Sequence, residues 1–177
     1  MLTYSLEEVL PNRFCTLDNL LQLYAHEINE YYKYSISMGY NGQYKIRSAK
    51  SLLDAGWGYF IVVGGEYAGF VLLNNCTKVK EGTFIAEYYI MPKYRKGYFF
   101  KDVVVGLFAG LTGIVEYRVL RSNKRALFLF EALAKRYFSD YQKVDECEFG
   151  LDYFRFVVDT ENFSKGFPPS PIGKFNV

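Results

Sequence analysis

Two apolar segments joined by a pair of glycines constrain the fold of this chain more than any other feature. Residues 57–63 (WGYFIVV) and 68–73 (AGFVLL) are each long enough for one strand, and Gly64-Gly65 lies between them. Glycine readily adopts the positive φ angles that a tight two-residue hairpin turn requires. The pattern therefore predicts an antiparallel hairpin in the first half of the chain.

The residues before this hairpin predict one strand and two helices. Residues 2–10 are expected to form a strand that Pro11 ends, and a helix with Thr16 or Asp18 as its N-cap follows. His26 falls off the apolar side of this helix, so we expect it to be solvated. A shorter helix is expected over residues 46–53. Apolar side chains recur along the first helix at spacings of three and four, which predicts one buried stripe: Leu17, Leu20, Leu21, Tyr24 and Ile28.

The second half alternates strands and helices. The expected elements are a strand over residues 83–91, a helix over 100–111, a strand over 115–120, a helix over 123–137 and a closing hairpin within 149–158. Antiparallel strands followed by a βαβα segment indicate a single α/β domain with a mixed, largely antiparallel sheet and helices on both faces. We assign this domain to residues 1–160.

The composition excludes several classes of function. The net charge of +2 is too small to indicate a nucleic-acid partner, and three widely spaced cysteines with one histidine predict no metal site. No apolar segment approaches the ~20 residues of a transmembrane helix, and the N-terminus lacks the basic segment of a signal peptide. We therefore expect a soluble protein of the cytoplasm with no membrane partner.

The last segment, residues 161–177, is rich in proline and is expected to be an irregular tail. We expect it to dock on its own domain or on a partner. A protein partner or a second copy of the chain could therefore bind through this tail.

Two sequence segments in the second half of the chain resemble motifs of a known family. The first is YIMPKYRKGYFF (residues 89–100), and the second is VLRSNKRALFLFEAL (residues 119–133). Their order and separation are similar to the GNAT superfamily of acyl-CoA-dependent N-acyltransferases. In that family a strand leads into a glycine-rich loop and a helix, and an N-x-x-A segment opens a later helix. The resemblance implies the GNAT fold and acetyl-CoA as the cofactor, with no metal.

By this resemblance, six residues would bind the cofactor. The loop would hold the pyrophosphate on backbone N–H groups at a helix N-terminus, and Asn123 would hydrogen-bond the pantetheine arm. Glu87, on the preceding strand, would act as the general base, although a surface or strand-pairing glutamate is an equally good interpretation. The expected cofactor-binding residues are Ile90, Arg95, Lys96, Gly97, Tyr98 and Asn123.

Two features depart from the family pattern. Tyr98 and Phe100 occupy positions where the family has glycines, and we expect the Phe100 ring to crowd the phosphates. Phe130 stands where many members have a tyrosine that protonates the leaving thiolate, and a phenyl ring has no proton to give. Tyr137, or Tyr94, is a candidate replacement for this acid.

Two functional hypotheses follow. The first is an enzyme, a GNAT-type N-acetyltransferase that transfers an acetyl group to the amine of an unidentified small molecule or protein. The second is a catalytically inactive GNAT-fold binding or structural protein within a larger assembly. A phage or virion component, or an inhibitor of a host factor, could use the GNAT fold for binding in this way. Such a protein would be located in the host cytoplasm or the virion.

Overall fold

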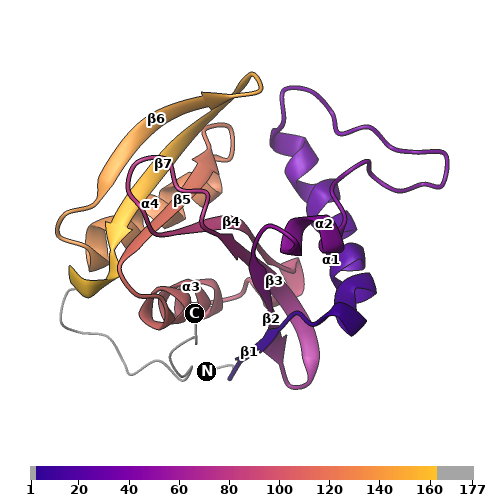
Figure 1. The fold of residues 1–177 in the computed structure, drawn as a ribbon, viewed down its shortest axis with the longest axis horizontal. Coiled ribbons are helices and arrows are strands. Elements are labelled where there is room, and N and C mark those ends of the chain that lie inside the picture. Colours follow the sequence, from indigo (N-terminus) through magenta and orange to yellow (C-terminus); the bar gives the residue numbers. More distant parts are fainter. Residues whose placement is uncertain (1–2, 163–177) are drawn as a thin grey trace.

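The computed structural model describes residues 3–162, which form one seven-stranded mixed sheet with helices on both faces (Figure 1). The strand order is β1-β2-β3-β4-β5-β7-β6, and only β4 and β5 pair in parallel. This confirms the expected α/β class. The strands are β1 (Ser5–Glu8), β2 (Trp57–Val63), β3 (Glu66–Asn74), β4 (Thr83–Ile90), β5 (Ile114–Leu120), β6 (Gln142–Glu148) and β7 (Leu151–Asp159). The α-helices are α1 (Phe14–Ile28), α2 (Ala49–Leu53), α3 (Phe99–Gly110) and α4 (Lys124–Tyr137).

The predicted central hairpin is confirmed as β2 and β3. Gly64 and Gly65 form its turn with φ angles of 58° and 81°, which a side chain would make unfavourable. β3 then pairs with β4, so the hairpin extends into a meander at one side of the sheet. The expected tail begins at residue 161, and from residue 163 onward it lies outside the described residues.

Helix α1 begins earlier than the sequence predicts. Its N-cap is Arg13, which makes no side-chain cap bond, so the prediction of Thr16 or Asp18 as the cap is wrong. The Asp18 carboxylate instead accepts a 2.6 Å hydrogen bond from the backbone N–H of Ala49 and so ties α1 to the start of α2. His26 is exposed, as expected, and its Nδ1 lies 2.8 Å from the hydroxyl of Tyr44.

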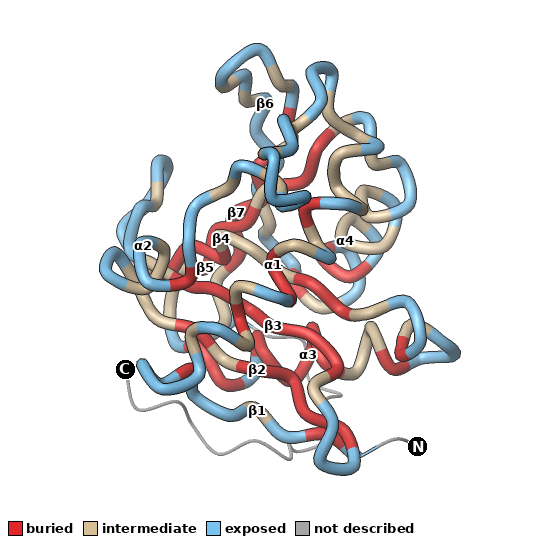
Figure 2. Tube along the Cα trace, turned by 90° about the vertical axis from the view of Figure 1, so that its right-hand side faces the viewer, coloured by how far each residue is buried: buried red, intermediate tan, exposed pale blue. Residues whose placement is uncertain are grey.

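The two pairs of helices cover opposite faces of the sheet. The face under α1 and α2 buries Phe60, Phe70 and Leu72 against Leu17 and neighbouring residues of α1. On the other face, α3 and α4 pack on side chains of β3, β4, β5 and β7. Figure 2 shows many of the buried residues along the central strands and in α3.

The C-terminal hairpin lies earlier in the chain than predicted. Its strands are β6 and β7, joined at Phe149 and Gly150, whose φ angles are 51° and 74°. The sequence of β6, QKVDECE, has no apolar alternation because β6 is an edge strand with mostly exposed side chains. Phe149, predicted as a strand residue, therefore lies in the turn, whereas Leu151 begins β7 as a strand residue.

The central feature of the sheet is a divergence between β4 and β5. These strands pair only between residues 83–85 and residues 115–117, although both continue beyond that point. The register of β4 against β3 also shifts opposite Leu72 and Leu73, a β-bulge that bends β4 as it leaves β5. The second halves of the two strands consequently form the sides of an opening in the middle of the sheet.

Candidate active site

A cavity of about 960 Å³ occupies the opening between β4 and β5. Its wall includes both diverging strands, helix α1 on one face of the sheet, and helices α3 and α4 on the other, together with Tyr153 of β7 and residues of the loops that follow α1 and β4. The volume is at the upper end of the range that ligand pockets cover. A ligand that passes through the sheet would therefore contact both faces of the molecule.

The loop from β4 to α3 brings a helix N-terminus to this cavity. Gly97 adopts a φ of 63°, and apart from its two chain neighbours no residue has an atom within 4 Å of the position that a Cβ would occupy there. Tyr98 is the N-cap of α3 and makes no side-chain cap bond. The first backbone N–H groups of a helix have no acceptor inside the helix, and their dipoles favour an anion. The loop therefore presents uncapped N–H groups where the sequence resemblance implies a pyrophosphate.

The two aromatic side chains of this loop lie in different surroundings. Tyr98 is 76 % exposed and extends into solvent. Phe100 is half-buried, and its ring packs edge-on against Tyr88 at 5.4 Å and against Phe130 at 5.7 Å between centroids. Both residues line the cavity, and the Phe100 ring lies more than 4 Å from the position that a Cβ on Gly97 would occupy.

Basic side chains surround this side of the cavity. Lys96 is exposed in the loop outside the cavity wall. The cavity wall itself includes four cations from α3 and α4: Lys101, Lys124, Arg125 and Arg136. Their combined field, together with the helix N-terminus, favours a polyanionic ligand on the α3 and α4 side.

Arg95 lies in the cavity wall but is held by the protein. Its guanidinium forms a two-pronged ion pair with the carboxylate of Glu27 on α1, in which Nη2 lies 2.8 Å from Oε2. Its Nε donates a 2.5 Å bond to the carbonyl of Ile90. Arg95 therefore fixes the end of β4 against α1, and most of its donors are already in use.

Asn123 lies in the cavity wall as the N-cap of α4. Its Oδ1 accepts a 3.0 Å bond from the backbone N–H of Ala126. Within residues 3–162 the Nδ2 group has no acceptor, so this residue of the cavity wall keeps a spare donor. Both interpretations of Asn123, as a helix cap and as a ligand contact, are compatible with this geometry.

The backbone of β4 offers further donors to the opening. The N–H of Met91 donates to Ala68 on β3. Since N–H directions alternate along a strand, the N–H groups of Tyr88 and Ile90 point the other way, toward the edge that β5 has left. These two groups could bind a carbonyl oxygen inside the cavity, and Ile90 is one of the predicted cofactor contacts.

Tyr88 carries an unpaired polar atom. Among the described residues, its hydroxyl is the one buried side-chain oxygen or nitrogen without a hydrogen-bond partner. The Tyr88 ring lies in the cavity wall beside Phe130, which stands where the family tyrosine is expected. Burying an unpaired hydroxyl costs about 1–3 kcal/mol, so an unpaired hydroxyl beside a cavity indicates a site for a ligand atom. Tyr137, the predicted replacement acid, is not among the residues that line the cavity.

The other face of the cavity carries Glu87. Tyr24 of α1 donates a 2.6 Å hydrogen bond to its Oε2. Burial raises the pKa of Glu87, while the bond from Tyr24 and the charges of Arg118 and Arg47 act in the opposite direction. A carboxylate with a raised pKa that lines a cavity is suited to proton transfer. The structure thus brings Glu87 together with Ile90, Arg95, Gly97, Tyr98 and Asn123 around one cavity.

Sequence reasoning missed Tyr24, Tyr88 and Arg118. One signal for Tyr24 was present, because a hydroxyl on a buried apolar stripe needs a partner. Arg118 forms ion pairs with Glu146 and Glu148, and its Cζ lies 4.4 Å from the centroid of the Tyr153 ring in a cation–π contact. Those partners lie in the missed strand β6 and in β7, so its position could not be anticipated.

Neither a membrane-spanning helix nor a metal cluster occurs within residues 3–162. No helix there has the length and apolar character needed to span a membrane. In the same residues, no three histidine, cysteine or acidic side chains come together in a way that could hold a metal ion.

Comparison with solved structures identifies the fold. An acetyltransferase from Thermus thermophilus superimposes with a TM-score of 0.62 at 14 % identity, covering 89 % of this chain and 97 % of that one. A spermidine N-acetyltransferase from Vibrio cholerae, in complex with CoA and spermine, gives 0.60 at 13 % identity with 90 % and 96 % covered. A GNAT-family acetyltransferase from Bacillus cereus gives 0.58 at 11 % identity with 89 % and 97 % covered.

Sequence comparison alone finds nothing of this kind. No protein-family model matches the chain. No curated protein matches it either. The similarity is therefore one of structure. It agrees with the family that the sequence segments 89–100 and 119–133 resemble. The chain has the fold of the GNAT acetyltransferases.

Proposed function

We propose that this protein is an N-acyltransferase that moves an acetyl group from acetyl-CoA to an amine. The observation that carries the proposal is the cavity through the sheet, which has cationic side chains and a helix N-terminus on one face and an ionisable carboxylate on the other. A polyanionic donor can enter from the α3 and α4 side. An amine can reach the same point from the α1 side.

The donor side fits a CoA molecule in its chemistry. The N–H groups that follow Gly97 and the four cations of α3 and α4 would hold the phosphates, and the free Nδ2 of Asn123 would bind the pantetheine arm. When bound, acetyl-CoA supplies a thioester that an amine can attack directly. The Vibrio cholerae protein with this fold binds CoA, which supports this assignment.

The residues of this chain then provide three functions. The N–H groups of Tyr88 and Ile90 would stabilise negative charge on the thioester oxygen. Glu87 would accept the proton that the amine loses as its nitrogen bonds to the acetyl carbon. Phe130 offers no proton to the leaving sulfur. The anionic sulfur is a modest base, since thiols have a pKa of about 8.5, so it can leave without a dedicated acid.

A direct test follows the release of free CoA thiol from acetyl-CoA in the presence of a panel of primary amines. Amine-dependent release, with the acetylated amine seen by mass spectrometry, would support the proposal. The matched control is Glu87→Gln, which keeps the size of the side chain and an oxygen for the bond from Tyr24. Equal release of CoA thiol by the wild type and by Glu87→Gln would show that Glu87 is not the general base.

The alternative is a GNAT-fold protein that acts by binding alone. The loss of the tyrosine at Phe130 and the replacement of loop glycines by Tyr98 and Phe100 favour it. Failure of the protein to bind acetyl-CoA would leave this alternative standing.

A further inference from the structure

A second cavity, of about 350 Å³, adjoins the first on the α1 and α2 face of the sheet. The two cavities share Tyr24, Ile28, Tyr32 and Glu87 in their walls. Glu87 therefore lies at the point where they meet. A group held in the second cavity would reach the carboxylate from the side opposite to α3 and α4.

The wall of the second cavity is mostly apolar. Its apolar side chains come from α1, from the segment that precedes α2, and from α2: Leu21, Ala25, Ile28, Ile36, Ile46 and Leu52. Such a wall favours a hydrocarbon body over a polar chain. The small volume suits a small molecule.

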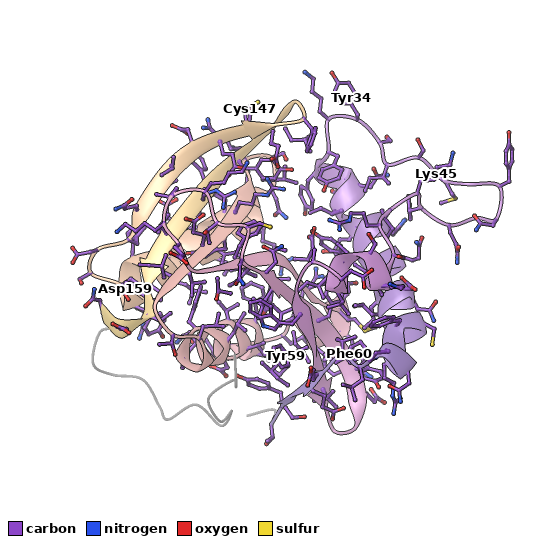
Figure 3. All side chains as sticks on the ribbon, in the orientation of Figure 1. Tyr34, Lys45, Tyr59, Phe60, Cys147 and Asp159 are labelled. Atoms are coloured by element: carbon purple, nitrogen blue, oxygen red, sulfur yellow. The ribbon has the colours of Figure 1, made fainter. Side chains whose placement is uncertain are left out.

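Two cations, Lys45 and Arg47, complete this wall. The ammonium of Lys45 has no ion pair or hydrogen bond to any described residue, and Figure 3 shows Lys45 on the loop that precedes α2. Arg47 donates from Nη2 to the carbonyl of Ser51 at 2.8 Å, which leaves its Nε and Nη1 without a protein acceptor in residues 3–162.

The nearby carboxylates do not neutralise these cations. Asp18 accepts from the backbone of α2, Asp54 pairs with Lys50, and Glu27 pairs with Arg95. Glu87 is the one carboxylate in the wall of the second cavity. The charge of Arg47 acts on Glu87, but neither Lys45 nor Arg47 forms an ion pair with a described residue. A molecule with several positive charges would therefore meet two cations, whereas an anionic group would find spare donors.

We infer that the acceptor is a small amine that carries a carboxylate on an apolar body, as an apolar amino acid does. Its amine lies at Glu87, its hydrocarbon part packs among the apolar side chains of the second cavity, and its carboxylate binds Lys45 and Arg47. This inference rests on the proposed acetyl transfer, and it excludes a polyamine such as spermidine as the preferred acceptor.

Binding measurements on the protein saturated with CoA, which cannot transfer an acetyl group, test the inference without turnover. The probes are matched pairs: L-leucine with 3-methylbutylamine, L-phenylalanine with phenethylamine, and 6-aminohexanoate with hexylamine, each compared with spermidine. We expect at least one carboxylate-bearing member to bind about tenfold or more tightly than its partner, the effect of one charge-assisted contact. Equal or tighter binding of the simple amines or of spermidine would overturn the inference, as would no binding by any carboxylate-bearing amine.

Substitutions of Lys45 and Arg47 test whether these residues bind the carboxylate of the acceptor. Lys45→Gln and Arg47→Gln should each weaken the preferred amino acid about tenfold and leave its decarboxylated partner unchanged. Lys50→Gln is the control, because Lys50 lies on α2 outside both cavities. Unchanged affinity in both variants would contradict the assignment.

If acetyl-CoA binds and amines are acetylated without preference for a carboxylate, the inference fails and the proposed function stands. If acetyl-CoA does not bind, the proposed function fails.

Discussion

The hydroxyl of Tyr24 donates a 2.6 Å hydrogen bond to Oε2 of Glu87 and so links helix α1 to strand β4 beside the cavity. This bond favours the ionised form of Glu87 and opposes the effect of burial, which raises the pKa of the carboxyl. Tyr24 therefore controls the pH at which Glu87 can accept a proton.

Replacing Tyr24 by phenylalanine should move the acidic limb of the pH profile. Loss of the hydrogen bond raises the pKa of Glu87 further, so kcat/KM with a given amine should fall at a higher pH than in the wild type. Tyr32→Phe is the control, because Tyr32 lines the same cavity without a hydrogen bond to Glu87. A limb that shifts equally in both variants, or shifts to lower pH in Tyr24→Phe, would contradict this role.

Replacing Glu87 by glutamine should separate chemistry from donor binding. We expect kcat/KM to fall about 100-fold or more, the usual contribution of a general base. The affinity for acetyl-CoA should stay the same, because Glu87 lies on the face of the sheet opposite to α3 and α4. Kinetics and calorimetry on the same sample measure both quantities, and a matching loss of acetyl-CoA affinity would show that Glu87 acts through the cavity's structure.

Replacing Tyr88 by phenylalanine should have opposite effects on the free and the ligand-bound protein. Removal of an unpaired buried hydroxyl relieves about 1 kcal/mol, so Tm of the free protein should rise by about 2–4 °C. If the hydroxyl bonds to the cofactor, the further rise in Tm on adding acetyl-CoA should be smaller than in the wild type. Thermal melts with and without acetyl-CoA measure both changes. A lower Tm in the free variant would mean that the hydroxyl is satisfied.

The ion pair between Arg95 and Glu27 should appear as a coupling energy in stability. We expect Arg95→Gln and Glu27→Gln each to destabilise the protein, and the double variant to be less destabilised than the sum by at least about 0.5 kcal/mol. Urea unfolding of the four proteins gives the cycle. Additive effects would show that the pair contributes nothing in solution.

Acid should destabilise the fold through Glu146. Arg155 and Lys78 bond its carboxylate and lower its pKa to about 2, despite the opposing effect of burial. A carboxyl with a lowered pKa stabilises the fold above its unfolded value near 4.5, and this stability is lost as the pH falls from there toward 2. Unfolding free energies between pH 6 and pH 3 should therefore decrease less steeply in Glu146→Gln than in the wild type. Identical slopes would exclude Glu146 as a source of acid sensitivity.

Local patterns made the central elements of the fold predictable. The turn at Gly64 and Gly65 needs glycine for its φ angles, and the apolar runs beside it are buried in the central strands. Strand β6 was not predictable, because an exposed edge strand shows no alternation between apolar and polar residues. Its position follows from its pairing with β7, which local sequence does not encode.

The candidate site was predictable where a short motif carries it. Gly97 and Asn123 lie in the cavity wall because each belongs to a turn or cap next to the divergence of β4 and β5. The partner of Arg95 was not predictable, since Glu27 lies 68 residues away on another element. The crowding expected of Phe100 was a prediction about a side-chain direction, and packing against Tyr88 determines that direction.

Calorimetric titration with acetyl-CoA, in the wild type and in Lys101→Gln, tests the central claim most directly. We expect saturable micromolar binding at one site per chain, weakened in Lys101→Gln and unchanged in the Lys50→Gln control. Lys101 follows the uncapped N-terminus of α3 in the cavity wall, whereas Lys50 lies on α2 outside it. No heat of binding at millimolar acetyl-CoA would contradict the account and leave a GNAT-fold protein that does not use this donor.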